Sequence, residues 1–187
     1  IEKFYKSFQT MVYAQSTTKL TTRQSRRRNR LSTVVASFRK GKFRSIPESS
    51  LKKLAARAHK VLASRSLRVI DMHTRYLIEC SFVDNQTIRR INKKFRSQNK
   101  ATDVISLSYF DNVVRHSHTT DPDECFVGEI FISVPYARTQ AAELGHSLLR
   151  ELEFLFVHGL LHVFGFDHIR PVERKEMFRL TDLILGD

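Results

Sequence analysis

The sequence is poor in cysteine and has no long apolar run. Its two cysteines, Cys80 and Cys125, lie far apart and match no CxxC or other sulfur-ligand spacing, which argues against a disulfide-stabilised scaffold. No apolar run approaches the roughly 20 residues that span a bilayer, so we expect no membrane segment. A hydrophobic fraction of 41% in 187 residues predicts a soluble globular protein with a real core.

Acidic residues are nearly absent from the first part of the chain. Residues 1–70 hold 18 of the 32 Lys and Arg residues but only 2 of the 19 Asp and Glu residues, so the net charge of +13 is concentrated there. The run Arg26-Arg27-Arg28 would neutralise phosphates and release their counterions, which makes nucleic acid the expected partner. The alternatives for this segment are a disordered tail and an organelle-targeting peptide.

Hydrophobic patterning divides the chain at Pro47. Residues 1–46 show no sustained amphipathic period, and we expect a basic extended segment that contacts RNA. Residues 47–187 alternate helix and strand patterns and predict one globular domain. Helices are expected after Ser49 or Ser50, Asp84 or Asn85, Pro135 and Ser147, and a last helix has Pro171 in its first turn. Strands are expected within 67–83, 102–107 and 126–133. The expected inner faces are Leu51, Leu54, Ala55, Ala58 and Leu62 in the first helix, Ile88, Ile91 and Phe95 in the second, and Val172, Met177, Leu180, Leu183 and Ile184 in the last.

Three histidines lie within the apolar stretch FLFVHGLLHVFGFDH. His158 and His162 are four residues apart and therefore project from one face of a helix. Gly165 is placed to end that helix in the left-handed conformation, so that the chain turns back and His168 can complete a site. Three neutral imidazoles with an open fourth position are typical of catalytic zinc. The alternatives are core histidines bonded to carbonyls, and a closed zinc site that would need a fourth protein ligand.

The stretch also lacks a glutamate after its first histidine. The spacing of the three histidines is that of the metzincin proteases, whose HExxHxxGxxH motif places the general base directly after the first histidine. Here that position is Gly159. Peptide hydrolysis would therefore lack its usual base, which argues against a protease while leaving the metal site intact. A second, looser pair of histidines, His116 and His118, is more typical of an exposed loop than of a metal site.

Four ordered motifs resemble those of the YbeY family, the metal-dependent endoribonucleases and rRNA maturation factors of bacteria and organelles. His158-Gly159-Leu160-Leu161-His162 and Gly165-Phe166-Asp167-His168 resemble its HGxLHLxGYDH signature. Ile91-Asn92 with Phe95-Arg96 resembles its LNxxYR, Thr102-Asp103-Val104-Ile105-Ser106 its PTDVLSF, and Val127-Gly128-Glu129-Ile130 its LGDI. The resemblance covers about residues 48–187. Ala101, Leu107, Glu129 and Phe166 depart from the family pattern, and none of them removes a ligand.

The resemblance implies an α/β domain with a mixed sheet of about four strands flanked by helices. It also implies a zinc ion held by His158, His162 and His168, and catalytic roles for Arg96 and His158. A guanidinium at Arg96 can grip a phosphate with two hydrogen bonds and stabilise charge that develops in the transition state. Without the resemblance, Arg96 and its neighbours Arg89, Arg90, Lys93 and Lys94 would be expected to form an ordinary solvated helix face.

Two functions are expected. The first is zinc-dependent cleavage of single-stranded rRNA during maturation of the small ribosomal subunit in an organelle. The second is a ribosome assembly factor that keeps the fold and metal site, binds rRNA and cleaves nothing. Both have rRNA, the small subunit or its assembly intermediate, and ribosomal or assembly proteins as partners. The Arg-rich start favours the mitochondrial matrix, with the chloroplast as the alternative.

Overall fold

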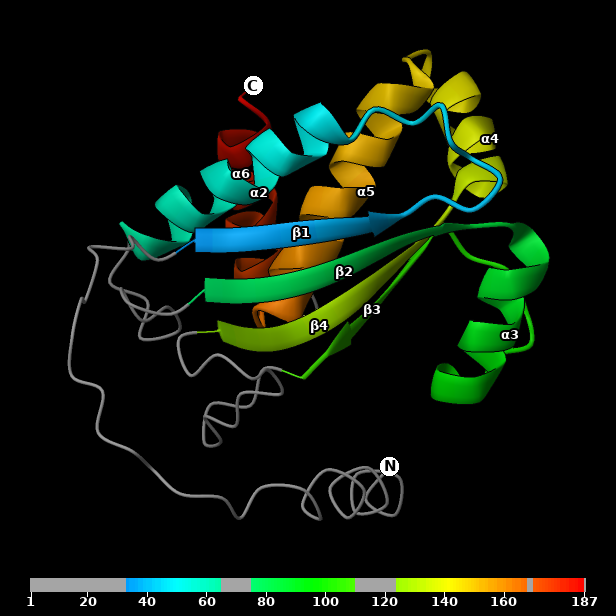
Figure 1. The fold of residues 1–187 in the computed structure, drawn as a ribbon, viewed down its shortest axis with the longest axis horizontal. Helices are drawn as coiled ribbons and strands as arrows, with labels where there is room; N and C mark the ends of the chain where they lie inside the picture. Colours follow the sequence, from blue (N-terminus) through cyan, green and yellow to red (C-terminus); the bar gives the residue numbers. More distant parts are fainter. Residues whose placement is uncertain (1–32, 65–74, 110–123, 168–169, 187) are drawn as a thin grey trace, which may run out of the picture. The chain divides into compact units, whose positions relative to one another are not determined.

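A four-stranded mixed sheet organises this computed structural model (Figure 1), which describes residues 33–64, 75–109, 124–167 and 170–186. The strands have the order β1-β2-β4-β3. The first three in that order are parallel, and β3 runs antiparallel beside β4. Their bounds are Thr33–Arg39 for β1, Arg75–Val83 for β2, Val104–Ser108 for β3 and Glu124–Ser133 for β4. The predicted α/β class with a mixed four-stranded sheet is confirmed.

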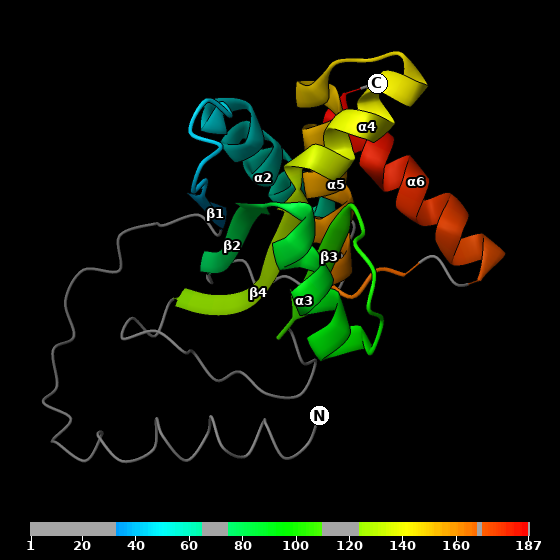
Figure 2. The ribbon, with the colours of Figure 1, turned by 90° about the vertical axis from the view of Figure 1, so that its right-hand side faces the viewer.

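Five helices surround the sheet in the described residues. They are α2 (Glu48–Ala63), α3 (Asn85–Arg96), α4 (Val134–Leu144), α5 (Leu148–Val163) and α6 (Pro171–Leu185). Helix α5 packs on β3 and β4, α2 packs on β1, and α2, α4 and α6 all contact α5. Figure 2 shows α2, α5 and α6 on one side of the sheet, with α3 beside β3. Among the helices described, none is long and apolar enough to cross a membrane.

The core lies between the sheet and α5. Along β2 the exposure alternates, with Tyr76, Ile78, Cys80 and Phe82 buried and the residues between them half-buried. This period of two places one face of the strand against the helices. Phe156 of α5 fills the opposite side of the same core and is fully buried. The apolar character of α5 is thus explained by the burial of most of its residues from Glu151 to Val163.

The predicted boundary at residues 46/47 is wrong, because β1 belongs to the sheet. Val34 and Ala36 of β1 are buried, and the strand pairs with β2 from Thr33↔Arg75 to Arg39↔Ser81. The compact unit accordingly begins near residue 31. A strand of seven residues has no helical period, and its partner lies some 40 residues further along the chain, so the local pattern did not reveal it. The rest of the predicted extension, residues 1–32, lies outside the described residues.

The predicted helix starts are partly confirmed. Asp84 caps α3, since its Oδ1 accepts the Thr87 N–H at 2.8 Å. Helix α2 instead begins at Glu48 after an extended Pro47 that provides no side-chain cap, so the predicted serine caps are wrong. The predicted inner face of α2 is confirmed, because Leu51, Leu54, Ala55, Ala58 and Leu62 are all buried.

Two predicted apolar faces are only partly correct. In α3 the buried residues are Ile88 and Asn92, whereas Phe95 is 45% exposed. In α6, Val172 and Leu183 are 81% and 41% exposed, although Met177, Leu180 and Ile184 are buried as predicted. These helices pack through a narrower stripe than their composition suggests. The predicted strand before residue 75 and the pair His116 and His118 lie outside the described residues.

Candidate functional site

Two of the predicted metal ligands lie side by side on α5. The ring centroids of His158 and His162 are 4.8 Å apart, with the ring planes at 83°. Both side chains are half-buried. One turn earlier, Phe154 stacks on His158 with centroids 5.9 Å apart and planes at 16°. The structure therefore brings two imidazoles together on one flank of the helix, as their spacing predicts.

Gly165 ends α5 directly after the histidine pair, as predicted. Its φ is +85°, and the N–H groups of Gly165 and Phe166 donate to the carbonyls of His162 and Leu161, both at 3.0 Å. These two bonds with a left-handed glycine form a Schellman motif, which satisfies the last carbonyls of the helix. A β-carbon on Gly165 would meet no atom within 4 Å, so backbone conformation rather than space requires glycine. Phe166 then packs against the core.

The third predicted ligand, His168, lies outside the described residues. Within those residues, no group of three His, Cys, Asp or Glu side chains is placed to hold an ion. The pair itself fits zinc, because imidazole nitrogens ligate zinc at about 2.0–2.1 Å and two rings on one helix flank can share an ion. His162 also lies in the last turn of α5, where the negative end of the helix dipole favours a positive charge.

Gly159, between the two histidines, is required by close packing. A β-carbon there would lie 2.9 Å from Cγ2 of Ile130 and 2.9 Å from Oγ of Ser106. The helix thus rests directly on β4 and β3 at this residue. The metzincin glutamate would occupy this position, so the fold leaves no room for the proteolytic base. The sequence argument against a protease therefore gains a steric reason.

A second glycine, Gly128, seats the last turn of α5 on the sheet. A β-carbon on Gly128 would lie 2.5 Å from the backbone oxygen of Leu107 and 2.8 Å from Cγ1 of Val163. Ser108 of β3 adds a hydrogen bond, because its hydroxyl donates to the Val163 carbonyl at 2.7 Å. Strands β3 and β4 therefore hold the residue that directly follows His162.

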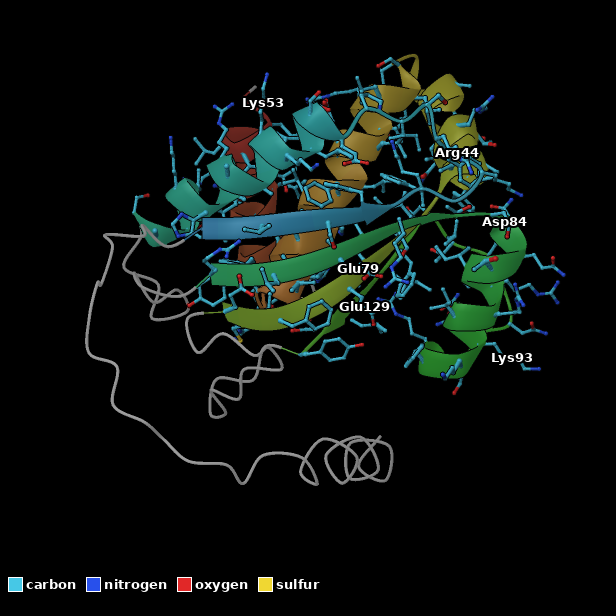
Figure 3. All side chains as sticks on the ribbon, viewed as in Figure 1. Arg44, Lys53, Glu79, Asp84, Lys93 and Glu129 are labelled. Atoms are coloured by element: carbon cyan, nitrogen blue, oxygen red, sulfur yellow. The ribbon has the colours of Figure 1, made fainter. Side chains whose placement is uncertain are left out.

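Glu129 faces away from the histidines. Its neighbours Gly128 and Ile130 contact α5, and side chains alternate along a strand, so Glu129 points to the opposite face of the sheet. There it accepts the Tyr109 hydroxyl at 2.6 Å, and its register partner is Glu79 on β2 (Figure 3). Glu129, which replaces the aspartate of the family pattern, therefore contacts Tyr109 and not the histidine pair.

Asn92 and Asp103 hold the loop between α3 and β3, a role that the sequence did not reveal. The buried Asn92 donates from Nδ2 to the Lys100 carbonyl at 2.8 Å. Oδ1 of Asp103 accepts the Val104 N–H at 2.7 Å, and its Oδ2 accepts Nε2 of Gln140 at 3.2 Å. These two motif residues are therefore anchors of the backbone that joins Arg96 to β3.

Arg96 is the last residue of α3, and its side chain is exposed. The next residue, Ser97, has a φ of +58° and turns the chain toward β3. Helices α3 and α5 both contact β3, so Arg96 and the histidine pair lie on two helices beside the same strand. The described contacts join His158 to His162, and they do not include one between Arg96 and either histidine.

A buried carboxylate elsewhere on α5 is too distant to act as a base for the pair. Glu151 is 4% exposed, and its Oε2 lies 3.2 Å from Nε2 of His146. Burial raises the pKa of Glu151, and the nearby His146 partly opposes that shift. Glu151 precedes His158 by seven residues, which is about 10 Å along a helix. Its position in the first turn suits the helix dipole instead.

Comparison with known proteins agrees with this arrangement. The family model described as "Endoribonuclease YbeY" matches residues 37–187. This chain belongs to the YbeY family. The match begins inside β1, which agrees with the corrected domain boundary.

Individual YbeY relatives are similar over more than half of the chain. Endoribonuclease YbeY of Streptococcus mutans is 45% identical over 120 residues, covering 56% of this chain and 71% of the relative. That of Acholeplasma laidlawii is 48% identical over 105 residues, covering 56% of this chain and 69% of the relative. The solution structure of TM1509 from Thermotoga maritima shares the fold, with a TM-score of 0.50 at 19% identity over 82% of this chain and 89% of that one.

Proposed function

We propose that this protein is a zinc-dependent endoribonuclease that processes small-subunit rRNA in an organelle. The observation that carries the proposal is the pair of half-buried imidazoles on α5, with ring centroids 4.8 Å apart, because such donors suit zinc. Membership of a family named for endoribonuclease activity supports RNA hydrolysis. The excess of basic residues before residue 70 supports RNA as the partner.

Each residue of the site has a role in this proposal. His158 and His162 would hold the ion, and His168 would be the third ligand. When bound, zinc supplies Lewis acidity toward a phosphoryl oxygen or a water molecule. Phe154 limits the rotation of the His158 ring by stacking on it. Arg96 would bind the phosphate through two N–H groups and stabilise negative charge as it develops.

The test is cleavage of a 3′-extended small-subunit rRNA precursor by zinc-loaded protein, with His162→Ala prepared in parallel. We expect the wild type to cleave and the variant to lose both cleavage and bound zinc, measured by metal analysis. His59→Gln is the matched control, because His59 is a half-buried histidine on α2, outside the site. It should keep both properties.

Two results would count against the proposal. Equal cleavage by wild type and His162→Ala would place the activity elsewhere or in a contaminating nuclease. Tight RNA binding without cleavage by any zinc-loaded protein would favour the assembly factor that binds rRNA and cleaves nothing. Under the nuclease proposal, a chain that lacks residues 1–32 should still cleave, with weaker RNA binding. The truncation stops at residue 32 because β1 begins at Thr33.

The proposed setting is the small ribosomal subunit or its assembly intermediate, with ribosomal or assembly proteins as neighbours. The Arg-rich segment supports the mitochondrial matrix as the location, with the chloroplast as the alternative. Imaging of the full chain fused to a fluorescent protein distinguishes the two organelles. Co-sedimentation with small subunits on sucrose gradients tests the partner.

A further inference from the structure

Helix α3 is rich in basic residues and has no acidic residue of its own. Its 12 residues, NQTIRRINKKFR, include five Lys or Arg residues and no Asp or Glu. The other described helices carry acidic residues beside their basic ones, as in the pairs Lys52–Glu48 on α2 and Arg179–Glu176 on α6. The nearest acidic residue in sequence, the capping Asp84, is already paired with Lys42 at 2.9 Å. The helix therefore presents a positive surface to solvent.

Three of these cations form a row. Arg89, Lys93 and Arg96 follow one another at spacings of four and three residues, so they lie on one side of the helix, about one turn of 5.4 Å apart. All three are exposed. The Nε of Arg89 donates to Oδ1 of Asn99 at 2.9 Å, and this neutral partner does not compensate the charge. A row of cations at turn spacing can follow a chain of phosphates.

An exposed aromatic ring directly precedes Arg96 in the sequence and lies on the next flank of α3, about 100° around the helix axis from the end of this row. Phe95 is 45% exposed in the last turn of α3, and the Lys94 ammonium lies 5.0 Å from its ring centroid. Sequence periodicity predicts a buried Phe95, so its exposure is a result of the tertiary packing. Cationic grooves combined with exposed aromatic rings bind single-stranded nucleic acid, because phosphates meet the charges and bases stack on the rings.

We propose that Arg89, Lys93 and Phe95, here called the α3 track, bind a single-stranded RNA segment and lead it to Arg96. This inference rests on the proposed function, since it names the surface that holds the RNA strand beside the nuclease site. A duplex keeps its bases paired and stacked internally, so Phe95 would contribute nothing to binding it. Single-stranded RNA is the ligand that uses both the charges and the ring.

The experiment measures binding of a fluorescent single-stranded RNA oligonucleotide by anisotropy, with zinc-free full-length protein over a range of salt concentrations. Arg89→Gln/Lys93→Gln should weaken binding about tenfold and reduce the slope of log Kd against log salt by about 1.4, which is 0.7 per lost phosphate contact. Phe95→Leu should weaken binding about 5- to 100-fold and leave the slope unchanged, because stacking is not ionic.

Lys53→Gln/Lys60→Gln on α2 is the matched control, since it removes the same number of exposed charges. Figure 3 shows Lys53 and Lys93 on well-separated parts of the domain. The control should bind RNA like the wild type. A duplex of the same sequence should bind more weakly than the single strand and should not respond to Phe95→Leu. Thermal denaturation verifies that every variant is folded.

Two outcomes would overturn the inference. Equal affinity and slope for the α3 variants and the α2 control would mean that the α3 track binds something other than RNA, such as an acidic protein. A Phe95→Leu variant that binds single strand and duplex as the wild type does would rule out stacking. A different result would contradict the proposed nuclease function, namely the absence of RNA cleavage by zinc-loaded protein. That result would not affect RNA binding by the α3 track, which is measured with zinc-free protein.

Discussion

Helices α5 and α3 lie beside the same strand, β3, and are built in opposite ways. Helix α5 is apolar and mostly buried, and glycines at Gly159 and Gly128 let it rest directly on the sheet. Helix α3 is basic, and only Ile88 and Asn92 are buried. Close packing gives the two histidines of α5 a fixed position, whereas exposure leaves the charges of α3 available. Under the two proposals above, metal binding and RNA contact belong to different helices.

The prediction with the largest expected effect tests whether α3 also takes part in the chemistry. Under the proposed function, Arg96→Ala should lower kcat by about 10²- to 10³-fold, the usual loss when one preorganised donor is removed from a developing charge. Arg96→Lys should restore little, because an ammonium cannot make the bidentate contact. Single-turnover cleavage measures the effect.

Arg90→Ala is the control for that prediction. Arg90 is also an exposed arginine of α3, and it hydrogen-bonds only to Thr87 among the bonds described. Its removal should change kcat little. Equal losses of kcat in the Arg90 and Arg96 variants would mean that Arg96 acts only through its positive charge. Helix α3 would then contact RNA without taking part in the chemistry.

The second prediction tests the close packing of α5. Gly159→Ala should destabilise the protein by about 1–3 kcal/mol, because the added carbon meets Ile130 and Ser106 at 2.9 Å. In an exposed helix the same change would stabilise by up to about 1 kcal/mol. Denaturant unfolding measures the free energy.

A double variant sharpens that test. Ser106→Ala removes one of the two contacted atoms, so Ser106→Ala/Gly159→Ala should be more stable than the sum of the single effects by about 0.5 kcal/mol or more. A stabilising Gly159→Ala would contradict the close approach of α5 to the sheet.

The third prediction concerns the start of α3 and has the smallest expected effect. Asp84→Ala should cost about 1 kcal/mol at neutral pH, the usual value of an N-cap. The Lys42 ammonium and the Thr87 N–H hold the pKa of Asp84 well below its ordinary value. The pKa of Asp84 in the unfolded chain is about 3.9. Because the pKa is lower in the folded protein, the charged carboxylate stabilises the fold above this pH, and the stabilisation is lost as the pH falls below it.

The difference in Tm between wild type and Asp84→Ala should therefore shrink when the pH is lowered from 7 to about 3. Lys42→Ala is the control, because it removes the ion pair and keeps the cap. A Tm difference that stays constant over this range would mean that the charge of Asp84 does not contribute.

Sequence patterns predicted α5 well and β1 not at all. The expected start after Ser147 and the expected end at Gly165 agree with the observed helix Leu148–Val163. A serine cap, a long apolar run and a closing glycine are local signals. Strand β1 has a short pattern and takes its place only by pairing with β2. The site divides in the same way, because the histidine spacing was visible whereas the loop bonds of Asn92 and Asp103 were not.

By itself the sequence determined that His158 and His162 share a helix flank and that the chain turns at Gly165, because helix periodicity and capping depend only on neighbouring residues. Only the tertiary structure decided that Gly159 must lack a side chain, that Glu129 faces away from α5 and that Phe95 is exposed. These features depend on how elements far apart in the sequence pack against one another. Such packing leaves no periodic trace in the chain.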